Sequence, residues 1–401
     1  MVQYNKDFSG RKQMQRKPLN TYNRAQRWPG PAYWIILFVT LVLLVALTMT
    51  FFIALAVTKD IEKNVDPNGG DSTEGIVNNT TATGDKTGIV LPFATVSGNY
   101  LSTNASGFSQ IEGITSEAAV LVEVGSKTAV AGKNADVVIH PASMTKVMTL
   151  LVACENLTDP NELLTVKQEM LDRRTQLDGS GEIVDNTTVM DPDGDTEKIQ
   201  GAGISVTVED ALYLINYQSD TVACLMIAEK IAGSEAEFVK LMNKKAQEIG
   251  LTKTNFVNCT GLTEVTGEYN TTTCREMAAI LNCALNNVVA KKIISSTAKY
   301  YADVYTDGQK TGYTIPFFAD WHNRAARLNG NVKAGKVTIL GGKTGYEDIP
   351  TSCFITYGTS SANGKTYVCV IVGRLINSGS PLVYNATGTE DTRYIYKTYA
   401  N

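Results

Sequence analysis

Histidine is scarce in this chain: His140 and His322 are the only two among 401 residues. No cluster with the spacing of metal ligands accompanies them, and no Cys-x-x-Cys pair occurs. We therefore expect no metal site and no cofactor. A strong overall charge is also missing, since the net value is −4, and we expect no nucleic-acid partner.

The cysteines do not form an obvious pairing pattern. In a protein outside the cytoplasm, several cysteines would ordinarily indicate disulfides. An odd number cannot all pair, and Cys154 and Cys224 lie on apolar faces of predicted helices, where a free thiol behaves as a small hydrophobic group. We therefore expect mostly buried free thiols. The seven cysteines occur singly, at positions 154, 224, 259, 274, 283, 353 and 369.

Charged residues are absent from residues 32–57, a run rich in Leu, Ile, Val and Phe that starts at Ala32 and ends at Val57. About 20 apolar residues suffice to cross a bilayer as a helix. Residues 1–31 carry seven Lys or Arg against one acid, which predicts a cytoplasmic N-terminal tail. A cleaved signal peptide is the alternative, but the apolar run is too long for one. We predict a retained single-pass anchor in the cell membrane, with the remaining chain extracytoplasmic.

Apolar side chains are few in residues 58–111, where Asn, Thr, Gly, Ser and Asp dominate. Such a composition cannot bury a core, and it predicts a disordered, flexible extracytoplasmic linker. About 50 flexible residues have a root-mean-square reach of roughly 40 Å. A glycosylated stalk is the alternative interpretation, because Asn78 and Asn104 lie in glycosylation sequons.

The remaining residues, 112–401, are predicted to form one globular domain of the α+β class. A strand hairpin comes first, then helices, then further strands, which favours an antiparallel sheet with a helical subdomain packed against it. Residues 163–203 are polar and rich in Asp and Gly, so we expect an irregular segment with short elements there. The predicted strands are 118–124, 129–134, 300–305, 311–317, 337–345, 353–357 and 367–372. After a first helix around residue 143, the predicted helices are 207–217, 222–232, 235–249 and 273–285.

The first candidate site is the pair Ser143 and Lys146. We predict a buried helix whose first turn holds residues 141–143, and one turn places both side chains on the same face. A lysine beside a hydroxyl can take its proton if burial keeps the amine partly uncharged. The apolar residues at helical spacing are Met144, Val147, Met148 and Leu151.

Backbone N–H groups at the start of this helix would point to the place where an oxyanion forms. The hypothesis is that Ser143 attacks a carbonyl carbon. The alternative is an ordinary helix serine followed by an unrelated lysine, because the same spacing occurs by chance at Ser9 and Lys12.

A second polar motif, Ser219-Asp220-Thr221, lies in the short break between two predicted apolar helices. A triplet in this position is often only a helix N-cap, which is the alternative to a catalytic role.

Lys-Thr-Gly occurs three times, beginning at Lys86, Lys310 and Lys343. The first copy lies in the predicted linker and is attributed to chance, and the second lies in a predicted hairpin. The third follows two glycines, which allow a ligand or another backbone to approach closely, and it precedes an apolar hairpin suited to the centre of a sheet. We therefore assign the functional copy to Lys343.

These three motifs, in this order, resemble the penicillin-recognising serine D-alanyl-D-alanine carboxypeptidases. The resemblance covers roughly residues 112–400 and implies a β-lactamase/transpeptidase-like fold. It implies that the substrate is a peptidoglycan stem peptide and that β-lactams are covalent inhibitors. The segments similar to the family are 141–149, 207–210, 256–258, 261–262 and 342–346.

By this resemblance the reaction is acyl transfer between the two terminal D-alanines. Ser143 is the nucleophile, Lys146 its base, and Ser219 relays a proton to the leaving amine. Backbone N–H groups of Ser143 and Tyr346 are the implied oxyanion donors, and Lys343 with Thr344 is expected to hold the terminal carboxylate. The implied substrate-binding residues are Thr221, Lys343, Thr344, Gly345 and Tyr346.

Thr221 departs from the family pattern, which normally has asparagine at this place. A threonine hydroxyl lacks the separate donor and acceptor arms of a carboxamide, so weakened or altered activity is expected. A catalytically weak or inactive wall-binding homologue is therefore one alternative function. A β-lactamase is another, but no Glu-x-x-Leu-Asn segment follows the second motif to supply a deacylation base.

Overall fold

The computed structural model describes residues 89, 91–92, 95–178, 186–297, 299–317, 333–346, 353–375 and 387–400. The chain divides into two units, Met1–Asn79 and Thr80–Asn401, and all the described residues belong to the second unit. The predicted tail and anchor, and residues 58–88 of the predicted linker, lie outside the described residues.

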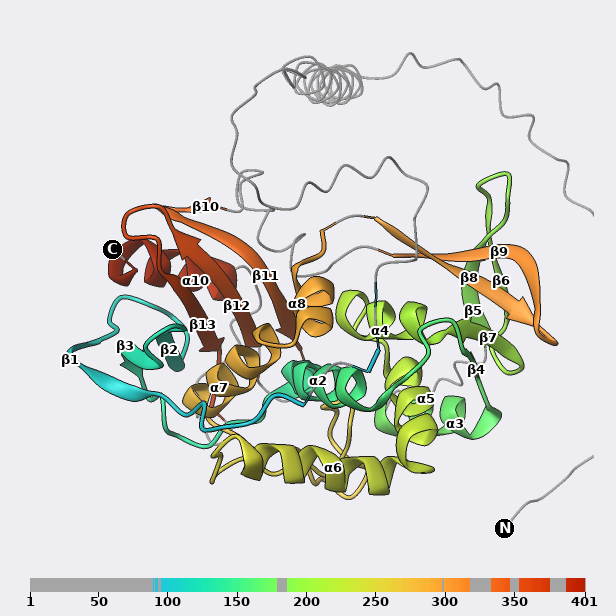
Figure 1. Ribbon diagram of the computed structural model, residues 1–401, viewed down its shortest axis with the longest axis horizontal. Helices are drawn as coiled ribbons and strands as arrows, with labels where there is room; N and C mark the ends of the chain where they lie inside the picture. Colours follow the sequence, from blue (N-terminus) through green and yellow to red (C-terminus); the bar gives the residue numbers. More distant parts are fainter. Residues whose placement is uncertain are drawn as a thin grey trace, which may run out of the picture. The chain divides into compact units, whose positions relative to one another are not determined.

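The described strands form two sheets, one of seven and one of six strands, with helices between them (Figure 1). In the seven-stranded sheet all neighbours are antiparallel except β1 and β3, which run parallel at one edge. The predicted antiparallel sheet is therefore confirmed except at this edge. In spatial order the strands are β1 (Thr103–Gln110), β3 (Thr128–Lys133), β2 (Ala118–Glu123), β13 (Thr366–Val372), β12 (Cys353–Ser360), β11 (Val337–Gly345) and β10 (Lys333–Ala334).

The middle of this sheet is buried on both faces, which explains its continuous apolar sequence. Six consecutive residues of β13 are buried, from Tyr367 to Val372, so no polar face alternates with an apolar one. Helix α7 (Cys274–Leu285) packs on β2 and β13, and helix α10 (Thr387–Tyr399) packs on β10, β12 and β13. Because both faces of β13 are buried, we place these two helices on opposite faces of the sheet.

The six-stranded sheet is more polar. The predicted hairpin at 300–317 is confirmed as β8 and β9, and its turn residues Asp307 and Gly308 have φ values of 50° and 74°, as a tight two-residue turn requires. In spatial order the strands are β4 (Leu163–Thr165), β7 (Ile204–Thr207), β8 (Tyr300–Thr306), β9 (Gln309–Phe317), β5 (Asn186–Met190) and β6 (Thr196–Gln200).

The helical layer is centred on α2 (Lys146–Asn156), whose first nine residues are all buried. A helix that is buried on every side belongs to the core rather than to the surface. It packs on the other central helices, and a short 3₁₀ turn, η1 (Ala142–Thr145), precedes it. The partners of α2 are α4 (Val208–Tyr217), α5 (Thr221–Ala232), α6 (Glu235–Glu248), α7 and α8 (Val288–Ser295).

Local capping chemistry explains where several helices begin. Thr207 accepts a hydrogen bond from the Asp210 N–H, and the Asp210 carboxylate accepts from the Thr207 N–H, which forms a capping box. Asp220, Ser234 and Thr273 cap α5, α6 and α7 in the simpler way. The predicted helices at 207–217, 222–232, 235–249 and 273–285 are confirmed to within one residue at each end.

Three helices were not predicted. Helix α3 (Gln168–Asp178) lies in the segment expected to be irregular, and α8 and α10 had no counterpart among the predicted elements. Strand β1 lies in residues assigned to the linker, so the linker prediction was wrong over 103–110. The reason is that β1 is a polar edge strand, most of whose residues stay exposed or half-exposed.

The segment before β1 is also packed against the domain. Ile89, Leu91 and Tyr100 are buried, and the Tyr100 N–H donates to the Ile249 carbonyl at 3.0 Å. Both backbone polar groups of Val96 are bonded: its N–H donates to Glu155 Oε1 at 2.8 Å, and Lys245 Nζ donates to its carbonyl at 3.2 Å. We call this arrangement the Val96 anchor point.

Among the described helices, none is alone long and apolar enough to cross a membrane. Only α7 and α8 taken together, bent by 109°, meet that test of length and composition. All seven cysteines are free and buried, which confirms the prediction of buried thiols.

Candidate active site

Ser143 lies in the η1 turn, where the side chain of Lys146 reaches it. Lys146 Nζ is 3.1 Å from Ser143 Oγ, and the exposed fractions of the two residues are 1% and 8%. The predicted buried helix is confirmed, but its first turn is the 3₁₀ turn η1 over Ala142–Thr145, with Pro141 as the preceding cap residue, and α2 begins at Lys146. In a 3₁₀ turn, residues three apart lie one above the other, and this brings the hydroxyl and the amine together.

The Lys146 amine also donates to the carbonyl of Thr260, at 2.6 Å. A neutral amine has two N–H groups and one lone pair. When one N–H is directed at the Thr260 carbonyl, the lone pair can face the Ser143 hydroxyl. The Thr260 carbonyl therefore fixes the orientation in which Lys146 could accept the proton of Ser143.

Thr260 belongs to residues 255–264, which we call the Asn258 loop. Asn258 Oδ1 accepts hydrogen bonds from the Thr260 and Gly261 N–H groups, at 3.2 and 2.8 Å. Gly261 has a φ of +84°, and a Cβ atom there would lie 2.0 Å from the Ala142 carbonyl oxygen. Only glycine allows the loop to lie this close to the η1 turn.

Asn270 joins the Asn258 loop to the η1 turn. Its Nδ2 donates to Thr145 Oγ1 at 3.0 Å, and its Oδ1 accepts from the N–H groups of Val257 and Asn258, at 2.7 and 3.1 Å. The side chain is fully buried. Sequence reasoning missed Asn270, and a single asparagine in a loop offers no signal that could have found it.

The second motif combines a helix cap with an unusual serine. Asp220 caps α5 by accepting from the Ala223 N–H at 2.8 Å, so the structural interpretation of the triplet is correct for this residue. Ser219 has a φ of +60°, and within the described part of the chain its buried Oγ has no hydrogen-bond partner. A buried hydroxyl without a partner is rare and is suited to receive a ligand group. Thr221 is buried at the first position of α5.

The third motif lies at the end of β11, beside the η1 turn. Lys343 pairs with Ile355 of β12, is 1% exposed, and donates from Nζ to the Thr344 carbonyl at 2.8 Å. A Cβ atom on Gly345 would lie 3.1 Å from the Pro141 carbonyl oxygen. The structure therefore brings the first and third motifs together through their backbones.

The remaining predicted residues of the third motif differ in exposure. Thr344 is buried, whereas 44% of Tyr346 is exposed. Of the two rejected Lys-Thr-Gly copies, Lys310 is exposed and forms an ion pair with Asp303 at 2.9 Å, and Lys86 lies outside the described residues.

With this geometry established, similarity to known proteins can be assessed. The model of the peptidase S11 family, described as D-alanyl-D-alanine carboxypeptidase, matches residues 104–374. The chain belongs to the peptidase S11 family. The match begins inside β1, in agreement with the corrected start of the domain.

Two curated relatives of this S11 chain carry related names. D-alanyl-D-alanine carboxypeptidase DacF of Bacillus subtilis (strain 168) is 32% identical over 58% of this chain and 58% of its own length. D-alanyl-D-alanine carboxypeptidase DacC of Escherichia coli (strain K12) is 27% identical over 56% of each. The chain thus spans less than two thirds of the length of these relatives.

Solved structures share the fold of this S11 chain. The Streptomyces K15 DD-transpeptidase has a TM-score of 0.55 at 20% identity, over 72% of this chain and 99% of that chain. A D-alanyl-D-alanine carboxypeptidase from Mycobacterium tuberculosis H37Rv has a TM-score of 0.51 at 20% identity, over 74% and 95%. The predicted transpeptidase-like fold of helices and sheets is confirmed for the described residues.

His140 supports the η1 turn of this S11 chain. Its Nδ1 accepts from the Ala142 N–H at 3.1 Å, its Nε2 lies 3.3 Å from Thr263 Oγ1, and its ring stacks on Tyr269 with centroids 5.0 Å apart. In the described ranges no group of three or more His, Cys, Asp or Glu side chains could hold a metal ion.

Proposed function

We propose that this chain is a serine D-Ala-D-Ala carboxypeptidase, which removes the terminal D-alanine from peptidoglycan stem peptides through an acyl-enzyme. The observation that carries the proposal is the contact of 3.1 Å between Lys146 Nζ and Ser143 Oγ in a buried turn. Membership of the S11 family and the names of its curated relatives support the same activity. The alternatives of an inactive homologue and a β-lactamase gain no support from these contacts.

In the proposed acylation step, Ser143 Oγ attacks the carbonyl carbon between the two D-alanines while Lys146 takes its proton. The C–N bond breaks, and the leaving amine of D-alanine receives a proton through Ser219 Oγ. Water then attacks the ester, which releases the shortened peptide and restores the Ser143 hydroxyl. Burial of Lys146 supports its role as a base, because desolvation disfavours the charged amine.

Recognition of the substrate is assigned to the third motif. Lys343 and Thr344 offer a cation and a hydroxyl to the terminal carboxylate of the peptide. The backbone N–H groups of Ser143 and Tyr346 are the proposed oxyanion donors. The close approach of Gly345 to the start of η1 supports this assignment, because an added Cβ atom would lie only 3.1 Å from the Pro141 carbonyl oxygen and the two donor-bearing segments are therefore adjacent.

Thr221 completes the proposed substrate site. It is buried at the start of α5, directly after the capping residue, and its hydroxyl can donate one hydrogen bond and can also accept. An amide of the substrate would need only one such partner, so we propose that threonine retains binding while altering substrate preference.

We further propose that residues 32–57 anchor the chain in the cell membrane as a single span, with the N-terminus cytoplasmic. The length of the apolar run and the basic residues before it support this topology. The cell wall, which contains the proposed substrate, lies directly outside that membrane.

The test is covalent labelling of the full chain, purified in detergent, with a fluorescent penicillin. Stable labelling that disappears in Ser143→Ala, together with D-alanine release from a pentapeptide, supports the carboxypeptidase. Rapid turnover of the penicillin would instead identify a β-lactamase. A folded wild-type chain that is neither labelled nor able to release D-alanine would identify a wall-binding homologue.

A further inference from the structure

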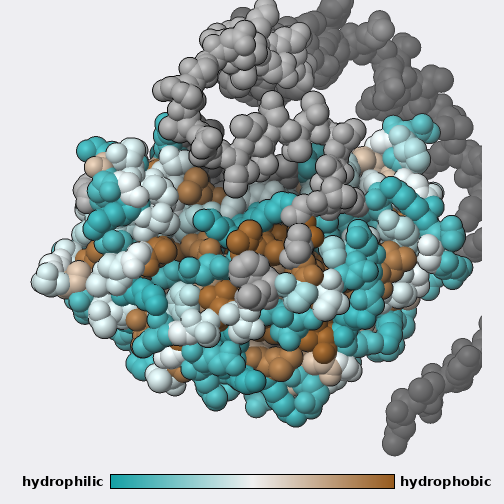
Figure 2. Space-filling view, in the orientation of Figure 1, coloured by the Kyte–Doolittle hydropathy of each residue, from teal (hydrophilic) through white to brown (hydrophobic). Residues whose placement is uncertain are grey.

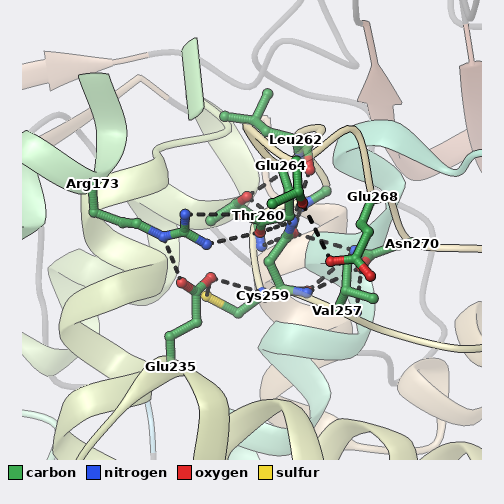
Figure 3. Close-up of polar contacts among 12 residues, drawn as sticks. Arg173, Glu235, Val257, Cys259, Thr260, Leu262, Glu264, Glu268 and Asn270 are labelled. Carbon is green, nitrogen blue, oxygen red and sulfur yellow. Dashed lines mark hydrogen bonds and ion pairs between the residues drawn. The ribbon is translucent and has the colours of Figure 1, made fainter. Parts of the chain in front are cut away.

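Arg173 of α3 clamps two carboxylates that come from different parts of the chain. Its Nε donates to Glu235 Oε2 at 3.0 Å, and its two terminal nitrogens donate to the oxygens of Glu264 at 2.9 and 2.8 Å. Glu235 is the first residue of α6, and Glu264 ends the Asn258 loop. Figure 3 shows the guanidinium group pointing between the two carboxylates. We call these three residues the Arg173 clamp.

Both carboxylates of the clamp also accept hydrogen bonds from the Asn258 loop. Glu264 Oε1 accepts from Asn258 Nδ2 at 2.8 Å. Glu235 Oε1 accepts from the Cys259 N–H at 3.2 Å, and Figure 3 shows these two residues beside each other. The clamp therefore holds two consecutive residues of the loop, and the next residue is Thr260.

Thr260 carries the carbonyl that receives the Lys146 amine at 2.6 Å. Its own N–H and Oγ1 donate to Asn258 Oδ1, each at 3.2 Å. A continuous chain of contacts thus runs from the Arg173 guanidinium through Glu264 and Asn258 to the Lys146 amine. Without Arg173, the carboxylates of Glu235 and Glu264 would lose the cation that binds both of them. Their mutual repulsion would then disturb this chain of contacts.

Because the Arg173 clamp is partly buried, its two carboxylates depend more strongly on the charge of Arg173 than they would in water. Side-chain exposures are 27% for Arg173, 17% for Glu235 and 15% for Glu264. Burial by itself lowers the pKa of Arg173, but the hydrogen bonds and charges of the two glutamates outweigh it, and the pKa is raised. The guanidinium group therefore remains charged, and its fork matches the two oxygens of Glu264.

We propose that Arg173 is a positioning residue for the reaction of Ser143: by holding Glu235 and Glu264, it fixes the Thr260 carbonyl that orients the Lys146 amine. This inference rests on the proposed function, and it assigns a role to a helix that the sequence motifs do not include. It concerns the chemical step, because none of the clamp residues belongs to the proposed carboxylate-binding motif.

The experiment measures acylation of the full chain in detergent by a fluorescent penicillin, as a function of penicillin concentration and of pH. In Arg173→Gln we expect the acylation rate at saturating penicillin to fall by about 10²-fold, the scale of a 1 Å misplacement of a reacting group. The half-saturating concentration should stay within twofold, and the pH of half-maximal acylation should shift. A purely structural role would move neither the pH profile nor the rate at saturation in a folded variant.

Two further variants provide the controls. Arg174→Gln removes the same charge from the next position of α3 without touching either glutamate, and it should acylate like the wild type. Arg173→Gln combined with Glu264→Gln removes one of the two facing charges while keeping an oxygen for Asn258. This double variant should recover at least tenfold of the lost rate.

A folded Arg173→Gln variant with the acylation rate and pH profile of the wild type would overturn the inference. If Arg173→Gln does not fold, Arg173→Lys decides: it keeps one charge but loses the fork, and a wild-type rate in this variant would also overturn it. If the wild type itself is not acylated, the proposed function fails and the inference falls with it. If the wild type is acylated and the Arg173 variants are acylated at the same rate, the proposed function is kept and only the inference about Arg173 fails.

Discussion

Two copies of Lys-Thr-Gly lie in the two sheets of this protein, and their surroundings differ in every respect. Lys310 of β9 has an exposed side chain, at 55%, and pairs with Asp303 on the neighbouring strand. Lys343 of β11 is 1% exposed and lies on a strand whose end meets the η1 turn. The same three residues therefore serve a polar hairpin in one sheet and a buried site in the other.

The difference shows that burial and neighbours, rather than the triplet itself, determine what the motif can do. The six-stranded sheet ends in the polar strands β5 and β6, and the face drawn in Figure 2 is mostly hydrophilic there. Over the central helices of the same face, hydrophobic residues come to the surface (Figure 2). Of the two strands, only β11, which lies beside that apolar layer, places its lysine, Lys343, where water is excluded.

The largest expected effect comes from removing the edge of the seven-stranded sheet. A fragment starting at residue 112 lacks β1 and the buried side chains of Ile89, Leu91, Tyr100 and Ile111. Burying four such side chains is worth roughly 6–12 kcal/mol. Since a whole domain is stabilised by about 5–15 kcal/mol, we expect this fragment to be unfolded and unlabelled by penicillin.

The matched fragment begins at residue 80 and keeps all of these contacts. It should unfold cooperatively on heating and be labelled like the full chain. Calorimetry of both fragments checks the prediction, which fails if their melting temperatures agree within a few degrees.

The second effect separates the two lysines directly. In Lys343→Ala we expect kcat/KM for D-alanine release from a pentapeptide to fall about 10–100-fold, because a hydrogen bond to a charged group is worth roughly 1.5–3 kcal/mol. Lys310→Ala should stay within twofold of the wild type. An equal loss of kcat/KM in Lys343→Ala and Lys310→Ala would show that the two lysines do not differ in function.

The third effect concerns the glycines of the two triplets. A methyl group on Gly345 would lie 3.1 Å from the Pro141 carbonyl oxygen and 3.2 Å from Cys353 Cβ, so Gly345→Ala should push β11 away from the η1 turn. We expect acylation to slow by about tenfold, by the same sensitivity to misplacement. Stopped-flow measurement of penicillin acylation gives this rate.

Gly312 provides the comparison for Gly345. Its φ is +89°, and the nearest atom to an added methyl group, Pro192 Cγ, is 3.6 Å away. Gly312→Ala should therefore lower the free energy of unfolding by about 1–2 kcal/mol through backbone strain alone, with unchanged acylation. A tenfold slower acylation in Gly312→Ala would contradict this assignment.

The smallest effect is the pH dependence due to a buried thiol of the seven-stranded sheet, since no strand of the six-stranded sheet contains cysteine. Burial, and secondarily the charge of Asp391, raises the pKa of Cys369 on β13 above its ordinary value of 9.0. A pKa raised in the folded state means that the contribution to stability is complete below pH 9 and is lost as pH rises further. One such thiol changes the free energy of unfolding by up to about 1.4 kcal/mol per pH unit above 9.

Urea unfolding at pH 8 and pH 10.5 measures this loss. Cys369→Ala should lose less stability between the two pH values than the wild type does. The neighbouring variant Val368→Ala creates a cavity in the same strand, since Val368 is fully buried, but it removes no titrating group. The thiol explanation is wrong if both variants keep the full pH dependence of the wild type.

The elements that sequence reasoning found are those whose signal is local. The capping box of Thr207 and Asp210 marks the start of α4, and the apolar runs of β11, β12 and β13 mark the centre of a sheet. Each of these patterns occurs within a few residues, so no knowledge of distant contacts was needed.

Three of the missed elements, α3, α10 and β1, are polar segments ordered by contacts with distant residues. Helix α10 is held where Asp391 accepts from the Ser116 N–H at 2.7 Å and where Tyr396 OH lies 3.0 Å from Thr356 Oγ1. Helix α3 and strand β1 likewise have few apolar residues of their own. For such segments the surrounding structure outweighs local preference.

The same distinction applies to the candidate site. Three motifs could be recognised because each is a short run of residues, and the structure brings Ser143, Lys146 and the end of β11 together. Arg173 could not be recognised, since it lies 91 positions before Glu264 and its own helix resembles a solvated one. The residues that are proposed to react lie in short, recognisable motifs. The residues that hold them in place, such as Arg173, are scattered along the chain.

The Val96 anchor point has a mechanical consequence. Tension reaching the domain along the chain from the N-terminal side passes the buried side chains of Ile89 and Leu91 and then meets the hydrogen bonds of Val96 and Tyr100. These bonds join the segment to α2, to α6 and to the residue that follows α6. The load therefore enters the stiff helical layer before it reaches β1. A pull would first stretch the contacts of Glu155 and Lys245, and Glu155 lies at the opposite end of α2 from Lys146.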